Sequence, residues 1–288
     1  MSTKRIIIGY DGSPQSKAAA AWALDEAART DAPVELFYAY EWPGWAPMAS
    51  MIPSRAPRPE ASIRRAVDGT LAAALGEARR THPHVPATST TVDGDAAVSL
   101  IDRSAGAGLI VLGAHGHSGV TGLLGSITVA VSAHAHCPVV VVRGAARADR
   151  PVVAGIDESP ASHAVLGFAF DAASARGVPL HVIRAWAPTI GIMDATPLAS
   201  GTVPPAIRRP FDELLAGWRE KYPAVPVTAR AVVRHPAAAL TGVSAEAQLL
   251  VVGTHGRGRL RGLLLGSVGQ HLLRHAECPV AIAHETEG

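Results

Sequence analysis

The stretch LLVVGTHGRGRLRGLLLGS, residues 249–267, and its counterpart LIVLGAHGHSGVTGLLGS, residues 109–126, decide the fold. Each has an apolar run, then a glycine-rich segment, then a Gly-Ser pair at the predicted start of a helix. A run that is apolar on both faces is typical of a parallel strand covered by helices on both sides. Both stretches therefore predict a strand, a loop and a helix of an α/β fold.

The similarity extends outward from these two stretches. Residues 6–14 read IIIGYDGSP and residues 152–160 read VVAGIDESP, while CPVVVV at 137–142 matches CPVAIA at 278–283. The order is the same in both copies, and the separation is 140 to 146 residues. A period of that length is a whole domain, so the chain is a tandem duplication. The short connector at 144–150 divides it into domains 1–143 and 151–288.

Strands and helices alternate within each copy. In the first copy the expected strands are Lys4–Tyr10, Val34–Tyr40, Ala87–Val92, Leu109–Leu112 and Pro138–Val142, and the expected helices are Pro14–Arg29, Glu60–Arg80, Asp95–Ser104 and Ser126–Ala135. In the second copy the expected helices are Pro160–Ala175, Pro205–Lys221, Ala237–Ala247 and Ser267–His275. This alternation predicts an α/β fold of two tandem, doubly wound, five-stranded parallel sheets, Rossmann-like, with strand order 3-2-1-4-5.

The last strand of each copy is apolar and lies at the edge of its predicted sheet. An exposed apolar edge invites pairing with another strand. We therefore expect residues 138–142 to pair with residues 279–283 of the same chain, which makes an intrachain pseudo-dimer. Further association into a homodimer is a second expectation.

The composition excludes several classes of partner. The 288 residues carry a net charge of +2 and only 5% aromatic residues, so we expect no nucleic-acid partner. No stretch of the sequence is apolar over the length that a secretory signal or a membrane span needs. We therefore expect no membrane partner and a cytoplasmic location. Cys137 and Cys278 each precede a proline at matching positions, which favours a shared packing role over a disulfide.

A ligand is expected beyond the carboxyl ends of the strands, where the strand order reverses. Asp11 follows the first strand of one copy and Asp157 that of the other, and a glycine-rich loop follows each fourth strand. Glycines let backbone amides approach an anion, and a helix start at Ser126 or Ser267 favours negative charge. Further candidate phosphate partners are Arg257, Arg259 and Arg261 in the second loop, and His115 and His117 in the first.

Other interpretations of these residues stay open. A glycine-rich loop is also found as a simple turn, and an aspartate after a strand often caps a turn instead of contacting ribose or magnesium. His134 and His136 look like metal ligands, but the second copy does not keep them, and histidines near a helix end interact with its carbonyls. The long stretches 41–59 and 187–205 are either a flap over a ligand or a partner surface. No catalytic residue is assigned, because the sequence has no Ser-His-Asp, GxSxG or Walker signature.

The combined pattern resembles the universal stress protein family. It consists of G-x2-G-x9-G-S after the fourth strand, D-x-S after the first and C-P-V before the fifth. The second copy fits in full through Gly253, Gly256, Gly266 and Ser267. The resemblance covers both halves and implies a tandem member of the ATP-binding type.

The resemblance also implies roles for single residues. Asp11 and Asp157 would lie near ribose and near magnesium carried by the nucleotide, with no metal ion held by the protein alone. Gly9 and Gly155 would permit close approach, and the backbone of Ala39 and Ala185, just after the second strand, would face adenine. The phosphates would lie against Gly113, Gly116, Gly125 and Ser126 in the first copy, and against Gly253, Gly256, Gly266, Ser267 and Val268 in the second. Gly119 and Arg259, in the same two loops, are further candidate contacts.

The first copy departs from the family pattern. Only eight residues separate Gly116 from Gly125, against nine between Gly256 and Gly266. One residue spans up to about 3.5 Å, so later amides in the shorter loop are expected to shift. We therefore hypothesise that the first site binds ATP more weakly than the second, or differently.

The function expected from the sequence is an ATP-binding universal stress protein with a regulatory or stress-response role and no fast catalysis. One alternative is an enzyme that uses an adenine nucleotide, either a slow ATPase or an adenylating enzyme. Another is an interaction scaffold whose first site is degenerate.

Overall fold

The computed structural model describes residues 4–40, 59–116, 124–144, 147–186, 203, 205–256 and 265–285. The first half forms β1 (Ile6–Gly9), α1 (Pro14–Thr30), β2 (Val34–Tyr40), α2 (Pro59–Thr81), β3 (Ala87–Asp93), α3 (Ala96–Ser104), β4 (Leu109–Gly113), α4 (Ser126–His134) and β5 (Val139–Val142). The second half forms β6 (Val152–Ile156), α5 (Ala161–Arg176), β7 (Leu180–Trp186), α6 (Pro205–Lys221), β8 (Val227–Val233), α7 (Pro236–Ser244), β9 (Leu249–Gly253), α8 (Ser267–His275) and β10 (Val280–Ala283).

The predicted alternation of strands and helices is confirmed, and most bounds agree within one or two residues. The largest difference is in α7, which was expected to reach Ala247 and ends at Ser244. The chain turns there, because the amide of Ala247 bonds to the carbonyl of Ser244 at 3.2 Å. The amide of Gln248 then bonds to the carbonyl of Pro151 at 3.1 Å, which directs the backbone into β9.

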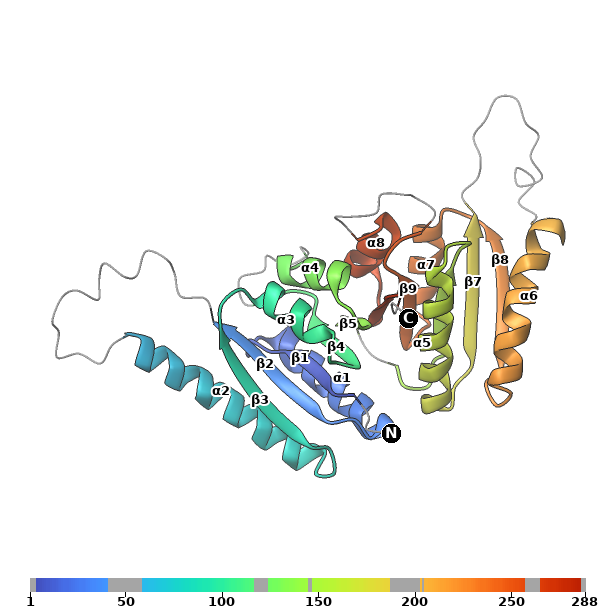
Figure 1. Ribbon diagram of the computed structural model, residues 1–288. Helices are drawn as coiled ribbons and strands as arrows, with labels where there is room; N and C mark the ends of the chain where they lie inside the picture. The colour runs from blue at the N-terminus through green and yellow to red at the C-terminus, as the bar shows by residue number, and fades with distance from the viewer. Residues whose placement is uncertain are drawn as a thin grey trace.

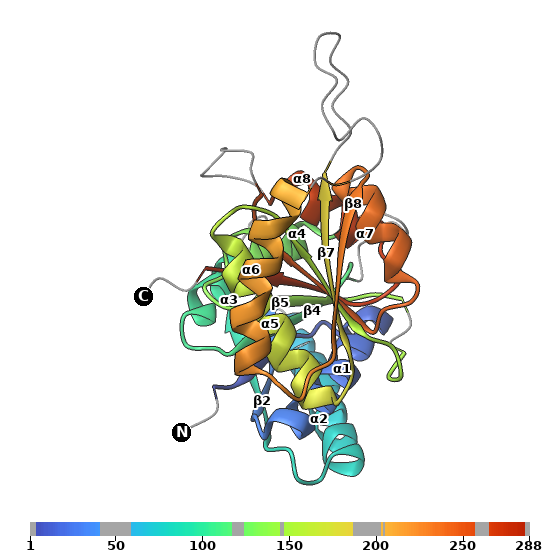
Figure 2. The same cartoon turned by 90° about the vertical axis from the view of Figure 1, so that its right-hand side faces the viewer.

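All ten strands form one sheet in the order β3-β2-β1-β4-β5-β10-β9-β6-β7-β8. Each half has the predicted order 3-2-1-4-5 with parallel neighbours, and β5 pairs with β10 in the antiparallel direction. The predicted association of the halves through their last strands is therefore confirmed, and this boundary along β5 and β10 is called the join. The halves lie on either side of these two strands (Figure 1), and a quarter turn shows the strands fanned out by the sheet's twist (Figure 2).

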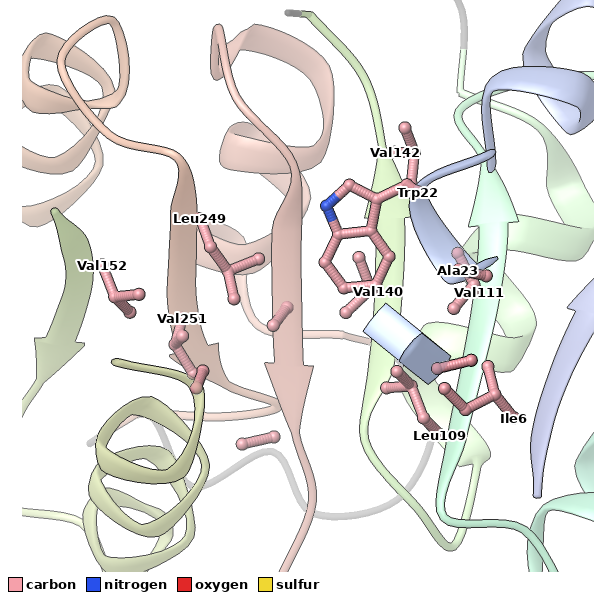
Figure 3. Packing of buried hydrophobic residues seen from close by; sticks show 14 of the residues in the cluster. Ile6, Trp22, Ala23, Leu109, Val111, Val140, Val142, Val152, Leu249 and Val251 are labelled. Carbon is pink, nitrogen blue, oxygen red and sulfur yellow. The ribbon is translucent and has the colours of Figure 1, made fainter. Parts of the chain in front are cut away.

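Two apolar layers fill the space between the sheet and its helices. One lies under α1, α2, α5 and α6 and contains side chains from both halves, among them Trp22, Val140 and Val251 (Figure 3). The other lies under α3, α4, α7 and α8 and is also continuous across the join. The strands beside the join are apolar on both faces, as the sequence predicted, because each face is covered by helices.

Helices α1 and α5 end in the same way. The residue after α1, Asp31, has φ 51°, and the residue after α5, Gly177, has φ 63°, so both caps are left-handed. Glycine adopts this conformation at little cost, and aspartate is one of the few other residues that tolerate it. The matching caps fix the residue-by-residue correspondence of the two helices.

Cys137 and Cys278 are buried free thiols. Burial raises the pKa of each thiol to about 12. Both side chains belong to the apolar layer under α3, α4, α7 and α8, which agrees with the packing role that their matching positions indicated.

Candidate functional site

The carboxyl ends of β1 and β4 lie side by side, because β1 pairs with β4 on one side and with β2 on the other. Strand β6 has the same arrangement with β9 and β7. Asp11 and Asp157, which follow β1 and β6, therefore lie next to the loops that follow β4 and β9. Because β5 and β10 are antiparallel, the strands of the two halves run in opposite directions, and their carboxyl ends point to opposite ends of the shared sheet.

In both crevices an aspartate carboxylate lies against a glycine of the loop. A Cβ atom on Gly116 would lie 2.6 Å from Oδ2 of Asp11, and one on Gly256 would lie 2.7 Å from Oδ2 of Asp157. Carbon and oxygen do not approach this closely without a bond, so any other residue would displace the carboxylate. The sequence placed these residues near each other, but their direct contact became visible only in the structure.

The other oxygen of each aspartate is held by the turn that follows the strand. Oδ1 of Asp11 accepts a hydrogen bond from the amide of Ser13 at 2.9 Å. Oδ1 of Asp157 accepts one from the amide of Ser159 at 2.8 Å and another from its hydroxyl at 2.5 Å. The turn-capping interpretation is thus correct for Oδ1 in both copies, and Oδ2 faces the loop.

The two copies use their serines differently. Ser13 caps α1, since its hydroxyl accepts a hydrogen bond from the amide of Ser16 at 3.1 Å, whereas α5 has no side-chain cap. Ser159 instead donates a hydrogen bond from its hydroxyl to Asp157.

Each glycine-rich loop ends at a helix start without a side-chain cap. Gly125 and Gly266 are the N-cap residues of α4 and α8, and neither has a side chain to bond the first amides. Such amides attract anions, because they carry the positive end of the helix dipole. The predicted contacts Ser126, Ser267 and Val268 are the first residues of these helices.

The ends of the two loops are anchored in the same way. The amide of Gly125 bonds to the carbonyl of Ala114 at 3.0 Å, and that of Gly266 bonds to the carbonyl of Thr254 at 2.8 Å. The missing residue of the first copy therefore lies between matching anchors. The predicted shift of later amides is therefore not seen at the start of α4, since α4 begins at the residue equivalent to the start of α8 and the two N-cap glycines have similar φ and ψ.

Four other predicted glycines of the two sites pack against protein atoms. A Cβ on Gly155 would lie 2.6 Å from Leu240, and one on Gly9 would clash with Leu112. A Cβ on Gly113 would lie 2.8 Å from the Cβ of Gln15, and one on Gly253 would lie 3.0 Å from that of Ala161. Gly113, Gly155 and Gly253 therefore let helices approach the strand ends, and Gly9 leaves room for the Leu112 side chain of the neighbouring strand β4. The sequence did not reveal this packing role.

The place expected for Ala39 and Ala185, just after the second strand, is wrong, and for Ala39 it disagreed with the predicted strand Val34–Tyr40, which is correct. Both are the second-last residues inside β2 and β7, because these strands extend one residue further through pairing with Asp93 and Val233. Their backbone still lies at the carboxyl edge that carries the aspartates.

The residues beside these alanines differ between the copies. In the first copy burial, and secondly the Asp11 carboxylate, raises the pKa of Tyr10 and Tyr38. In the second copy Arg184 takes the place of Tyr38; it pairs with Glu158, and its guanidinium lies 4.6 Å from the ring centre of Trp186. This ion pair was not predicted from the sequence, although Glu158 stands where the first copy has Gly12.

Several predicted residues lie outside the described part of the chain. These are Gly119 and Arg259, together with His117, Arg257, Arg261 and almost all of the stretches 41–59 and 187–205. The other loop histidine of the first copy, His115, lies with its Nε2 atom 2.9 Å from the side-chain amide nitrogen of Gln15. Within the described ranges, no three side chains of histidine, cysteine, aspartate or glutamate gather as metal ligands.

The fold is an open α/β fold, and the same arrangement of aspartate, loop glycine and helix start recurs in both halves. The model of the universal stress protein family matches residues 2–143 and 150–284. The chain is 38% identical to a universal stress protein of Mycolicibacterium smegmatis over 290 residues, which cover 96% of each chain. It is 34% identical to one of Mycobacterium tuberculosis over 295 residues, which cover 98% of this chain and 97% of the relative.

The solved structures agree on the fold. A universal stress protein of Archaeoglobus fulgidus superimposes with a TM-score of 0.72 at 17% identity, covering 99% of this chain and 97% of that one. The chain therefore belongs to the universal stress protein family, with two family units in tandem. Across the residues that the structure describes, no helix is long and apolar enough to span a membrane.

Proposed function

We propose that each half binds one molecule of ATP and that the chain has a regulatory or stress-response role without fast catalysis. The observation that carries this proposal is found twice: an aspartate carboxylate in contact with a loop glycine, beside a helix start that has no side-chain cap. Backbone amides at such a point suit phosphate, and the carboxylate suits a ribose hydroxyl or a magnesium ion.

The residues fit the nucleotide as follows. Gly116, Ser126 and their neighbours would hold the phosphates in the first half, and Gly256, Ser267 and Val268 would do so in the second. Asp11 and Asp157 would contact ribose or the magnesium bound to the phosphates. The backbone at Ala39 and Ala185 would face adenine. The proposed units are residues 1–143 and 151–288, and the proposed location is the cytoplasm.

We infer that the two sites are unequal. The first loop is one residue shorter, and the second crevice has the Glu158–Arg184 pair where the first has Gly12 and Tyr38. These differences support weaker or different ATP binding in the first half. A scaffold with a degenerate first site remains the alternative there, and slow ATP hydrolysis or adenylation is the alternative for the nucleotide-bound protein.

The test is nucleotide titration of the purified full chain by calorimetry, with and without magnesium. We expect two ATP sites of different affinity, and mass spectrometry of material released by denaturation to identify adenine nucleotide. Gly116→Ala and Gly256→Ala should each remove one site, because the new methyl group displaces Asp11 or Asp157.

Matched controls are Gly76→Ala in α2 and Gly217→Ala in α6, where an added Cβ meets nothing within 4 Å. Both controls should keep two sites. Failure to bind any adenine nucleotide, with the fold intact by circular dichroism, would contradict the proposal. Equal affinity at both sites would contradict only the inferred inequality.

A further inference from the structure

Helices α1 and α5 meet across the join, and a buried ion pair links them. The Arg176 guanidinium contacts the Glu26 carboxylate through two nitrogens, at 2.5 and 3.3 Å. Only 4% of the Arg176 side chain and 8% of the Glu26 side chain are exposed. The guanidinium also lies 5.6 Å from the ring centre of Trp22 and donates to the carbonyl of Ala172 at 3.1 Å.

The join is close to two-fold symmetric in its backbone. Val140 of β5 lies opposite Ala281 of β10, and these two residues are equivalent in the duplication. An axis through this pair relates α1 to α5, whose left-handed caps at Asp31 and Gly177 fix the correspondence. Glu26 is then equivalent to Ala172, and Arg176 to Thr30.

The side chains break this symmetry. On the side opposite the ion pair, Thr30 and Ala172 stand where a second arginine and glutamate would be. They line a cavity of about 240 Å³ together with Glu26, Phe168 and Ala175. The join therefore has a buried ion pair on one side and a cavity at the symmetry-related place.

We propose that the Glu26–Arg176 pair determines which family units associate through this surface: a first unit with a second unit, and not two like units. The backbone surface of β5 or β10 is compatible with any combination, since the register is symmetric. Charge decides among the combinations. Only the unlike pairing brings the carboxylate of one unit to the guanidinium of the other.

Pairing of like units leaves buried charges without their partner. Two second units would place each Arg176 against Ala172 of the opposing helix, where Glu26 is missing; the adjacent carboxylate there, Asp171, is exposed and accepts a hydrogen bond from the hydroxyl of Tyr222 at 2.6 Å. Two first units would place each Glu26 against a threonine, with Arg29 of its own helix at 3.6 Å. A buried charge that loses its partner is strongly destabilising, so these pairings are disfavoured.

The proposal is tested in a full chain that carries a protease site in the connector, residues 144–150. The protein is folded first and then cut, so that the halves exchange, and native mass spectrometry measures which halves are paired. With the native residues we expect the unlike pair alone. A mixture of the two like pairs and the unlike pair near 1:2:1 would overturn the proposal.

The matched control is Thr30→Arg with Ala172→Glu, which builds the same ion pair on the cavity side. Every combination of halves then has both ion pairs, so the cut protein should give all three pairs. If this variant still formed only the unlike pair, some other feature would select the partner and the proposal would fail.

A second measurement on the uncut chain keeps the proposal testable if the cut halves aggregate. Glu26→Arg and Arg176→Glu should each lower the thermal unfolding midpoint by several degrees, because each places like charges together. The double variant restores opposite charges and should recover most of that loss. No recovery in the double variant would show that positions 26 and 176 act through the shape of their side chains and not through charge, and it would overturn the proposal.

Discussion

The ring of His284 donates a hydrogen bond from Nε2 to the carbonyl oxygen of Ser132, 3.1 Å away and on the other side of the join. His284 follows β10 in the second half, and Ser132 lies in α4 of the first. The histidine is buried, with 8% of its surface exposed. Burial, the largest cause, lowers the pKa of His284 to about 4.

We expect this histidine to make the join sensitive to acid. Its pKa is lower in the folded chain than in the unfolded chain, so between about pH 6.5 and pH 4 only the unfolded chain binds the proton. Stability therefore falls as the pH drops through this window, by up to about 3 kcal/mol, and levels off below pH 4. Urea unfolding at pH 7.5 and pH 5 measures the loss.

The control for this effect is His284→Gln, which keeps a donor and cannot be protonated. Carboxylates titrate in both proteins, so the difference between them isolates the histidine. The variant should lose less stability than the native chain on going to pH 5. Identical pH dependence in the two proteins would refute the assignment.

Gly155→Ala should destabilise the second half. The new methyl group would meet Leu240 at 2.6 Å and Val252 at 3.2 Å in a closely packed layer, and overpacking of this kind costs about 1–3 kcal/mol. Gly217→Ala, on an open part of α6, should instead stabilise the chain by about 0.5–1 kcal/mol, because alanine favours the helix. Denaturant unfolding of both variants compares the two sites, and equal effects would contradict the packing role of Gly155.

The variants Asp11→Asn and Asp157→Asn distinguish the hydrogen bond that each aspartate accepts in its turn from its proposed contact with the ligand. Asparagine still accepts the hydrogen bond from the amide of Ser13 or Ser159, so the turns and the thermal midpoint should change little. Loss of the charge should weaken binding of magnesium-ATP about tenfold or more at the altered site. Asp68→Asn, on the exposed side of α2, is the control. Unchanged affinity in both variants would mean that the aspartates only cap their turns.

Cys137 and Cys278 should be unreactive in the native protein. Both thiols are buried, and burial raises the pKa of each to about 12, so almost none of the reactive thiolate is present at pH 8. A thiol reagent such as dithiobis-nitrobenzoate should modify them only as fast as the chain unfolds, and two thiols should react at once in denaturant. Fast reaction of either cysteine in native buffer would contradict the described packing.

Much of the architecture depends on local patterns of apolar residues and on the repeated motifs, and it could therefore be predicted from the sequence. Apolar runs such as residues 139–142 indicate parallel strands covered on both faces, and the duplicated order of motifs indicates two units. Even the pairing of β5 with β10 followed from the sequence, because an apolar edge strand must be covered. The elements that carry the candidate site were predicted as well, because a glycine-rich segment of the same pattern follows the fourth strand of both units.

What the sequence could not supply are contacts between residues far apart in the chain. The carboxylate of Asp11 against Gly116, the methyl-free surface of Gly155 under Leu240, and the Glu26–Arg176 pair across the join each depend on how twisted strands and helices come together. The sequence determined which elements form and in what order, because that depends on the periodicity of neighbouring residues. Only the tertiary structure decided which side chains are buried in contact with one another, because packing and the energies of buried charges depend on which residues are neighbours in space.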